Sequence, residues 1–126
     1  MAGQELMEEY PERKMVSVDT LAASMGQGLL VYKACQARDE GKGLEENAQY
    51  IEDIKLKLCH WFTVDDLFFL KRGGRVSGVT ATVGTMLSIK PILHVDDEGH
   101  LINVSKVRGR KAAITELANR MEKLAA

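Results

Sequence analysis

The sequence predicts an α/β portion followed by an α+β portion. The first half has the order strand, helix, helix, which needs further parallel strands to make a stable sheet. The second half places two strand-like runs around an acidic turn and closes with an amphipathic helix, which is typical of a small antiparallel sheet covered by helices. We therefore expect the end of a parallel-sheet domain over residues 1–59, then most of a small antiparallel-sheet domain with helices over residues 60–126.

The first half begins with polar, helix-permissive residues. Gln4–Arg13 is interpreted as the tail of a helix that ends at Pro11, because ten polar residues have nothing to bury alone. Met15–Val18 predicts a short strand, and Ser24–Arg38 predicts a helix that ends at Gly41–Gly43. The large side chains of that helix share one face: Met25, Leu29, Tyr32 and either Cys35 or Gln36.

The middle of the chain predicts a helix, a strand and two weaker helices. Leu44–Leu58 has apolar residues at three- and four-residue spacing, and His60–Val64 has the aromatic and β-branched content of a strand. Asp65 can cap a short helix through Leu70 that Gly73 and Gly74 terminate. Ser77–Leu87 follows as a helix that is weak by propensity because it contains small residues: Gly78, Ala81 and Gly84.

The last third predicts a hairpin and a closing helix. Ile89–Val95 and Leu101–Val104 flank the turn Asp96–Gly99, whose glycine can adopt the left-handed conformation. The helix begins at about Arg110, and its apolar residues share one face: Ile114, Leu117, Ala118, Met121 and Leu124.

Composition limits the class of function. The formal charge of −1 over 126 residues gives no general attraction to nucleic acid, so a nucleic-acid partner is not expected. The longest apolar runs are interrupted by Asp65 and Asp66, so we expect no membrane span. Cys35 and Cys59 are too few for a disulfide framework; we expect buried thiols in a reducing cytoplasm.

The sequence offers no recognisable catalytic or metal centre. A nucleophile needs a base within hydrogen-bond reach, and none of His60, His94 and His100 lies in such a motif. His94 and His100 flank the hairpin and are interpreted as a cross-strand pair rather than metal ligands. Gly26–Gly28 opens a helix after a strand but lacks the third glycine of a dinucleotide fingerprint, so we favour a packing role. We expect no catalytic residue, metal or cofactor, and therefore not an enzyme.

Two basic segments are candidates for binding. In Lys71–Ser77, Arg75 follows Gly73 and Gly74 beside a helix start, which suits a carboxylate or phosphate; a helix cap followed by a solvated arginine fits equally well. Lys106–Lys111 has four cations in six residues before the last helix, where the helix dipole disfavours positive charge. This placement indicates a surface for a partner, and a solvated turn remains the alternative.

Five segments match a known pattern in order and spacing: Val18–Thr20, Ser24–Gly28, Asp66–Ser77, Leu87–Leu93 and Lys106–Ala112. Together they resemble the DegV family of bacterial fatty-acid-binding proteins over nearly the whole chain. The resemblance implies a cytoplasmic carrier with two domains that hold one long-chain fatty acid between them. Such a carrier presents the acyl carboxyl group to a separate fatty-acid kinase. Because family members are considerably longer, we expect this chain to be an internal piece.

The resemblance also implies roles for individual residues. Arg75 takes the place of an arginine near the carboxyl group, and Arg108 that of a cation on the kinase-facing surface. The expected ligand-binding residues are Gly73, Gly74, Arg75, Val79, Val83, Ile89 and Ile92. The expected partner-binding residues are Arg108, Arg110 and Lys111. A non-enzymatic interaction module that uses this basic patch, or a fragment of an anion-binding enzyme, remains an alternative. Unpaired strand edges also predict self-association.

Overall fold

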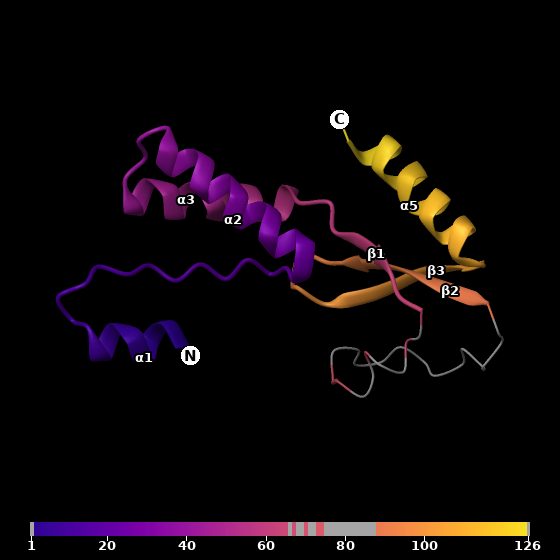
Figure 1. The fold of residues 1–126 in the computed structure, drawn as a ribbon, viewed down its shortest axis with the longest axis horizontal. Coiled ribbons are helices and arrows are strands. Elements are labelled where there is room, and N and C mark those ends of the chain that lie inside the picture. Colours follow the sequence, from indigo (N-terminus) through magenta and orange to yellow (C-terminus); the bar gives the residue numbers. More distant parts are fainter. Residues whose placement is uncertain (1, 66, 68–69, 71–72, 75–87, 126) are drawn as a thin grey trace. The chain divides into compact units, whose positions relative to one another are not determined.

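The computed structural model describes residues 2–65, 67, 70, 73–74 and 88–125. The chain divides into two compact units, Met1–Leu58 and Cys59–Ala126 (Figure 1). The described residues contain no helix that is both long enough and apolar enough to cross a membrane.

The described part of the first unit is helical. Its elements are α1 (Ala2–Glu9), α2 (Ser24–Asp39), α3 (Leu44–Ile54) and a short 3₁₀ turn, Lys55–Lys57. All three helices agree with the expectation from the sequence, and α2 ends before Gly41 as predicted. The first of them stops before Pro11, where the missing N–H and fixed φ of proline prevent a further turn.

Helices α2 and α3 pack as a pair and form the small core of this unit. Leu30 and Ala37 of α2 and Ile51 of α3 are buried. Asn47 of α3 donates a hydrogen bond from Nδ2 to the carbonyl oxygen of Ala34 at 2.8 Å, which fixes the two helices in register.

The apolar face predicted for α2 does not form this core. Met25 is 83% exposed, and Leu29 and Tyr32 are exposed as well. The packed stripe, which includes Leu30 and Ala37, is offset by one residue, a rotation of about 100° around the helix. The buried stripe also includes Gly26, whereas Met25 and Tyr32 remain exposed.

The strand predicted at Met15–Val18 is wrong. The segment carries no strand assignment, and within the described part of the chain no ladder pairs with it. The residues that flank the segment make side-chain contacts: Lys14 forms an ion pair with Glu45, and Lys55 Nζ donates to the carbonyl oxygen of Asp19 at 3.0 Å. Alternating side chains favour extended backbone, but a strand also needs a neighbour for its N–H and C=O groups.

The second unit is a three-stranded antiparallel sheet with a helix. Its elements are β1 (Trp61–Thr63), β2 (Ile89–Val95), β3 (Leu101–Arg108) and α5 (Arg110–Leu124), and the strands lie in the order β1-β2-β3. Helix α5 contacts all three strands. The buried residues in the described part of this unit come from β2 and α5: Pro91, Ile92, Leu93, Val95 and Ala113. The predicted α+β class is confirmed.

The predicted hairpin is confirmed and is longer than expected. Asp96 organises the turn, because its carboxylate accepts hydrogen bonds from the backbone N–H of Glu98 at 3.0 Å and of His100 at 2.8 Å. Gly99 adopts φ +81°, as the turn requires. β3 continues to Arg108, which pairs with Ile89, and a bulge interrupts the β2–β3 register between Ile92 and Leu93.

Two further expectations need correction. On α5, Ala113 is buried against the sheet, whereas Ile114 and Met121 of the predicted apolar face are exposed. Cys59 is exposed and Cys35 is only half-buried, so the expected pair of buried thiols is not found. The helix predicted at 77–87 and most of the one at 65–70 lie outside the described residues.

Candidate functional site

The glycine–arginine run is only partly described. Arg75, Val79 and Val83 lie outside the described residues. Gly73 and Gly74 form an exposed turn, with Gly74 at φ +68°. The predicted anion site around Arg75 therefore remains a prediction.

Ile89 and Ile92, both predicted to line a ligand site, lie on β2. Ile89 is half-buried at the start of the strand, whereas Ile92 is fully buried between Thr63 of β1 and Ser105 of β3. Successive side chains of a strand point to opposite faces, so residues three apart do not share one. The sequence predicts that both isoleucines line one ligand site, whereas the structure places their side chains on opposite faces of the sheet.

The predicted basic cluster is brought together by a sharp junction between β3 and α5. Gly109 occupies this junction at φ +91° and ψ 152°, a conformation that is essentially restricted to glycine. Its N–H donates to the carbonyl oxygen of Ser88 at 2.6 Å, which ties the junction to the start of β2. Arg108 thus ends the strand, and Arg110 and Lys111 begin the helix directly after it.

Arg110 belongs to a charge cluster on the β1 side of the helix. Its guanidinium lies 3.6 Å from the Oδ1 of Asp65, a residue that follows β1, and Lys90 Nζ lies 2.8 Å from the same oxygen. The hydrogen bond from Lys90, with the charges of Lys90 and Arg110, lowers the pKa of the exposed Asp65 carboxyl below its ordinary value. Lys90 and Arg110 therefore share the Asp65 carboxylate, which offsets part of the positive charge of Arg110.

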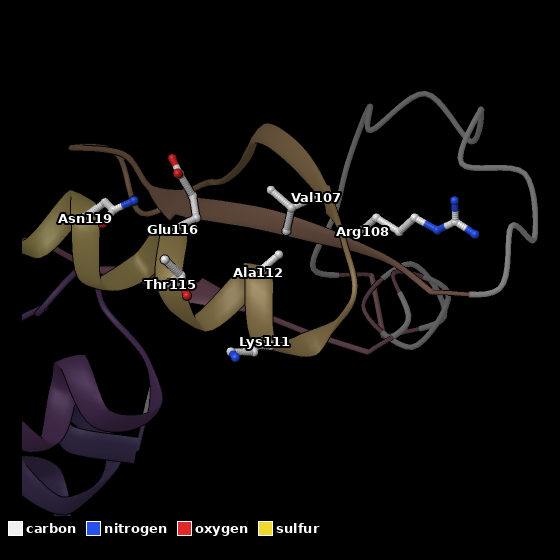
Figure 2. A pocket seen from close by; sticks show the side chains of 7 residues that line it. All are labelled: Val107, Arg108, Lys111, Ala112, Thr115, Glu116 and Asn119. Carbon is white, nitrogen blue, oxygen red and sulfur yellow. The ribbon is translucent and has the colours of Figure 1, made fainter.

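An open groove of about 570 Å³ runs between α5 and the end of β3, and Arg108 and Lys111 are among the residues that line it. The Arg108 side chain extends away from the other labelled side chains (Figure 2). We call this groove the β3–α5 groove. Two of its residues come from β3 and the rest from α5: Val107, Arg108, Lys111, Ala112, Thr115, Glu116 and Asn119. Among the described residues, neither Arg108 nor Lys111 has an ion-pair partner.

The groove contains residues that sequence reasoning missed. Lys111, Thr115 and Asn119 recur every four residues and form a polar stripe along α5 (Figure 2). That four-residue spacing was the signal available in the sequence. Glu116, at the edge of the groove, forms a hydrogen-bonded ion pair with Arg120 at 2.9 Å. The lining combines the apolar side chains of Val107 and Ala112 with the cations Arg108 and Lys111, an arrangement suited to an anionic or extended polar partner.

The histidines do not form the predicted cross-strand pair. His94 lies opposite Trp61 of β1 and Ile102 of β3, and its ring stacks on the Trp61 indole at 4.8 Å between centroids. The guanidinium of Arg120 lies 4.9 Å from the same indole ring. His100 instead stays in the turn, with Nδ1 3.5 Å from an Asp96 carboxylate oxygen.

Two of the histidines make ring contacts: His94 stacks on Trp61, and the ring centroid of His60 lies 5.8 Å from that of Phe62. Burial, followed by the nearby charge of His94, lowers the pKa of His60 below its ordinary value. The His60 Nδ1 is buried and has no hydrogen-bond partner within the described ranges. In the same part of the chain, no three His, Cys, Asp or Glu side chains are grouped to hold a metal ion.

Comparison with known proteins identifies the family. All of residues 1–126 match the family described as "Uncharacterised protein, DegV family". A DegV domain-containing protein of Clostridium perfringens is 50% identical over 123 residues, which is 98% of this chain and 42% of that protein. The chain thus spans less than half the length of this relative.

Solved structures agree in fold. A fatty-acid-binding DegV family protein from Thermus thermophilus is 36% identical, with a TM-score of 0.76 over 97% of this chain and 43% of that one. The Fatty Acid Kinase (Fak) B3 protein of Streptococcus pneumoniae, loaded with linoleic acid, is 27% identical, with a TM-score of 0.83 over 97% of this chain and 43% of its own. The chain described here belongs to the DegV family.

Proposed function

We propose that this chain takes part in binding a long-chain fatty acid and in presenting its carboxyl group to a fatty-acid kinase. The observation that carries the proposal is the family match over residues 1–126, together with a 36% identical relative that binds fatty acid. The role is that of a bacterial, cytoplasmic carrier rather than an enzyme. Because the chain spans less than half of these relatives, the proposal concerns the part that it contributes.

The ligand side of the proposal rests on the segment after β1. Arg75 directly follows Gly73 and Gly74 in the sequence, and an arginine guanidinium suits a carboxylate because its N–H groups can bind both carboxylate oxygens. We assign the head group to Arg75 and the acyl chain to apolar residues near it in sequence. The proposed ligand-binding residues are Gly73, Gly74, Arg75, Val79, Val83, Ile89 and Ile92.

The partner side rests on the junction of β3 and α5. Arg108 and Lys111 are exposed cations at the β3–α5 groove, and Arg110 lies on the opposite flank beside Asp65. Exposed cations steer a partner more than they hold it, since water and salt screen them. These three residues are therefore proposed to guide the kinase rather than to retain the lipid.

Native mass spectrometry of the chain, incubated with a mixture of saturated and unsaturated long-chain acids, tests the ligand. An added mass equal to one fatty acid supports the proposal. An adduct with a polar metabolite would instead indicate an anion-binding enzyme fragment. Absence of any adduct would refute lipid binding by this chain and favour the interaction module, for which the exposed cations of the β3–α5 groove already provide a surface.

Charge reversal tests the partner surface separately. With lipid-loaded chain and a bacterial fatty-acid kinase, Arg108→Glu should slow acyl phosphorylation several-fold at low salt while leaving the bound lipid in place. The defect should diminish at high salt, where screening removes the steering. Lys123→Glu is the matched control, because Lys123 is an exposed cation in the last turn of α5, away from the groove. Equal defects for both variants would contradict the assignment.

A further inference from the structure

The connection between β1 and β2 leaves the sheet at Asp65 and returns to it at Ser88. Asp65 follows β1, and Ser88 directly precedes β2. The chain between them, residues 66–87, includes Arg75 in the sequence. Contacts that hold Asp65 and Ser88 in place therefore fix the two points between which this segment runs.

Lys90 of β2 holds the first of these two ends. Its Nζ lies 2.8 Å from the Oδ1 of Asp65 and donates a hydrogen bond to the carbonyl oxygen of Asp65 at 3.3 Å. One ammonium group thus contacts both the side chain and the backbone of the same residue. The Lys90 side chain is only 18% exposed, whereas that of Asp65 is 76% exposed. A side chain with so little exposed surface has few alternative positions, so Lys90 is the fixed partner of this pair.

The start of α5 contacts both ends of the connection. Arg110 lies 3.6 Å from the same Asp65 oxygen, and the N–H of Gly109 donates to the carbonyl oxygen of Ser88 at 2.6 Å. Ser88 has φ +88°, a conformation that is uncommon for a residue with a side chain and that its neighbours must stabilise. Asp65 and Ser88 are therefore tied to two consecutive residues at the junction of β3 and α5.

We propose that Asp65, Lys90 and Arg110 form a clamp that fixes the ends of the segment 66–87 and so positions it for a fatty acid. Lys90 and Arg110 act as positioning residues, which need not touch the ligand. Fixing both ends restricts the arrangements open to the segment, and the apparent affinity rises with the fraction of the chain that is in the binding-competent arrangement. The inference rests on the proposed function, in which Arg75 binds the acyl carboxyl group. Arg110 has this role in addition to guiding the kinase.

Titration of the 126-residue chain with cis-parinaric acid, a fluorescent long-chain fatty acid, tests the clamp. Asp65→Asn and Lys90→Gln should each weaken binding about two- to fivefold, as expected for a partly exposed ion pair. Since both variants break one contact, the double variant should bind no more weakly than the weaker single variant. Arg110→Gln removes the longer contact and should have a smaller effect. Lys123→Gln is the matched control, because it removes an exposed cation from the last turn of the same helix.

A purely structural role of the ion pairs would give a different result. If they only stabilised the sheet, their loss would lower the urea concentration at the midpoint of unfolding and leave the dissociation constant of the folded chain unchanged. Lys90→Arg keeps a cation beside Asp65 and should restore most of the affinity that Lys90→Gln loses. Wild-type affinity in both Asp65→Asn and Lys90→Gln would overturn the proposal.

Amide hydrogen exchange measures the clamp without a ligand. The N–H of Gly109, which is bonded to Ser88, should exchange several-fold faster in Asp65→Asn than in the wild-type chain. The N–H of Val95 donates to the carbonyl oxygen of His60 at 3.0 Å, at the opposite end of the β1–β2 pair, and should exchange at an unchanged rate. If the wild-type chain bound no fatty acid while Gly109 still responded to Asp65→Asn, the proposed function would fail and the clamp would stand. Equal Gly109 rates in both chains would refute the clamp, whatever the chain binds.

Discussion

Truncation of Ile92 to alanine tests whether the second unit has its core beneath α5. Ile92 is 0% exposed, pairs with Thr63 on one side and Ser105 on the other, and belongs to the strand that α5 covers. Removing its three outer carbon groups forfeits about 2.4 kcal/mol of transfer free energy at about 0.8 kcal/mol each. The cavity left behind adds to this loss, so we expect a total of about 2–5 kcal/mol.

Trp61 provides the assay. It is the only tryptophan of the chain and lies in β1, so its fluorescence reports the unfolding of this unit by urea. The urea concentration at the midpoint of unfolding should fall. The m-value, which is the dependence of the unfolding free energy on urea concentration, should stay constant. Because a small domain can be close to unfolding after such a loss, Ile92→Val is the milder variant, with an expected cost of about 0.5–1.5 kcal/mol.

Val104→Ala is the control on the same sheet. Val104 is 42% exposed at the bulge of β3, so its truncation should cost well under the Ile92→Ala value. If Ile92→Ala proved no more destabilising than Val104→Ala, the burial of Ile92 beneath α5 would be refuted.

Two further predictions concern pH and backbone strain. The pKa of His60 is lower in the folded unit than the ordinary value of 6.5, so the unfolded chain binds the proton more tightly. The stability of this unit should therefore be full above about pH 6.5 and decrease as the pH falls below it. Urea titrations followed by Trp61 fluorescence should show this slope flattened by His60→Gln. Gly109→Ala should destabilise the same unit by about 1–3 kcal/mol, because φ +91° with ψ 152° strains any side chain. Gly28→Ala, in a helix with no atom within 4 Å of the new methyl group, should instead stabilise the first unit by up to about 1 kcal/mol. Thermal melts followed by circular dichroism compare the two glycine variants.

Local patterns in the sequence determined where most described elements begin and end. The three- and four-residue spacing of Leu44–Leu58 predicted α3, the residues of His60–Val64 predicted β1, and the acidic turn with Gly99 predicted the hairpin. These elements form as predicted because helix spacing, turn geometry and strand propensity act between residues close in sequence. The resemblance to the DegV family was likewise available from short motifs and is confirmed over the whole chain.

The candidate site was predictable in part. The run Lys106–Lys111 indicated a partner surface, and the structure does bring Arg108, Arg110 and Lys111 to one junction. It also divides them, because α5 turns Arg110 toward Asp65 and Lys111 toward the β3–α5 groove. No local pattern relates Asp65 to Arg110, since the contact depends on how the helix packs across the sheet.

The sequence by itself therefore determined the types and order of most described elements, the hairpin turn and the family. Tertiary structure decided which stripe of each helix is buried, whether Met15–Val18 has a strand partner, and how the basic residues divide. In α2 the stripe with Leu30 and Ala37 is buried and Met25 stays exposed, although its larger apolar side chains pointed to the other face. Which stripe of a helix is buried depends on how well its surface packs against the neighbouring element. Whether a segment forms a strand depends on whether another strand is available to pair with it. Both depend on residues distant in sequence, so neither can be obtained from spacing along the chain alone.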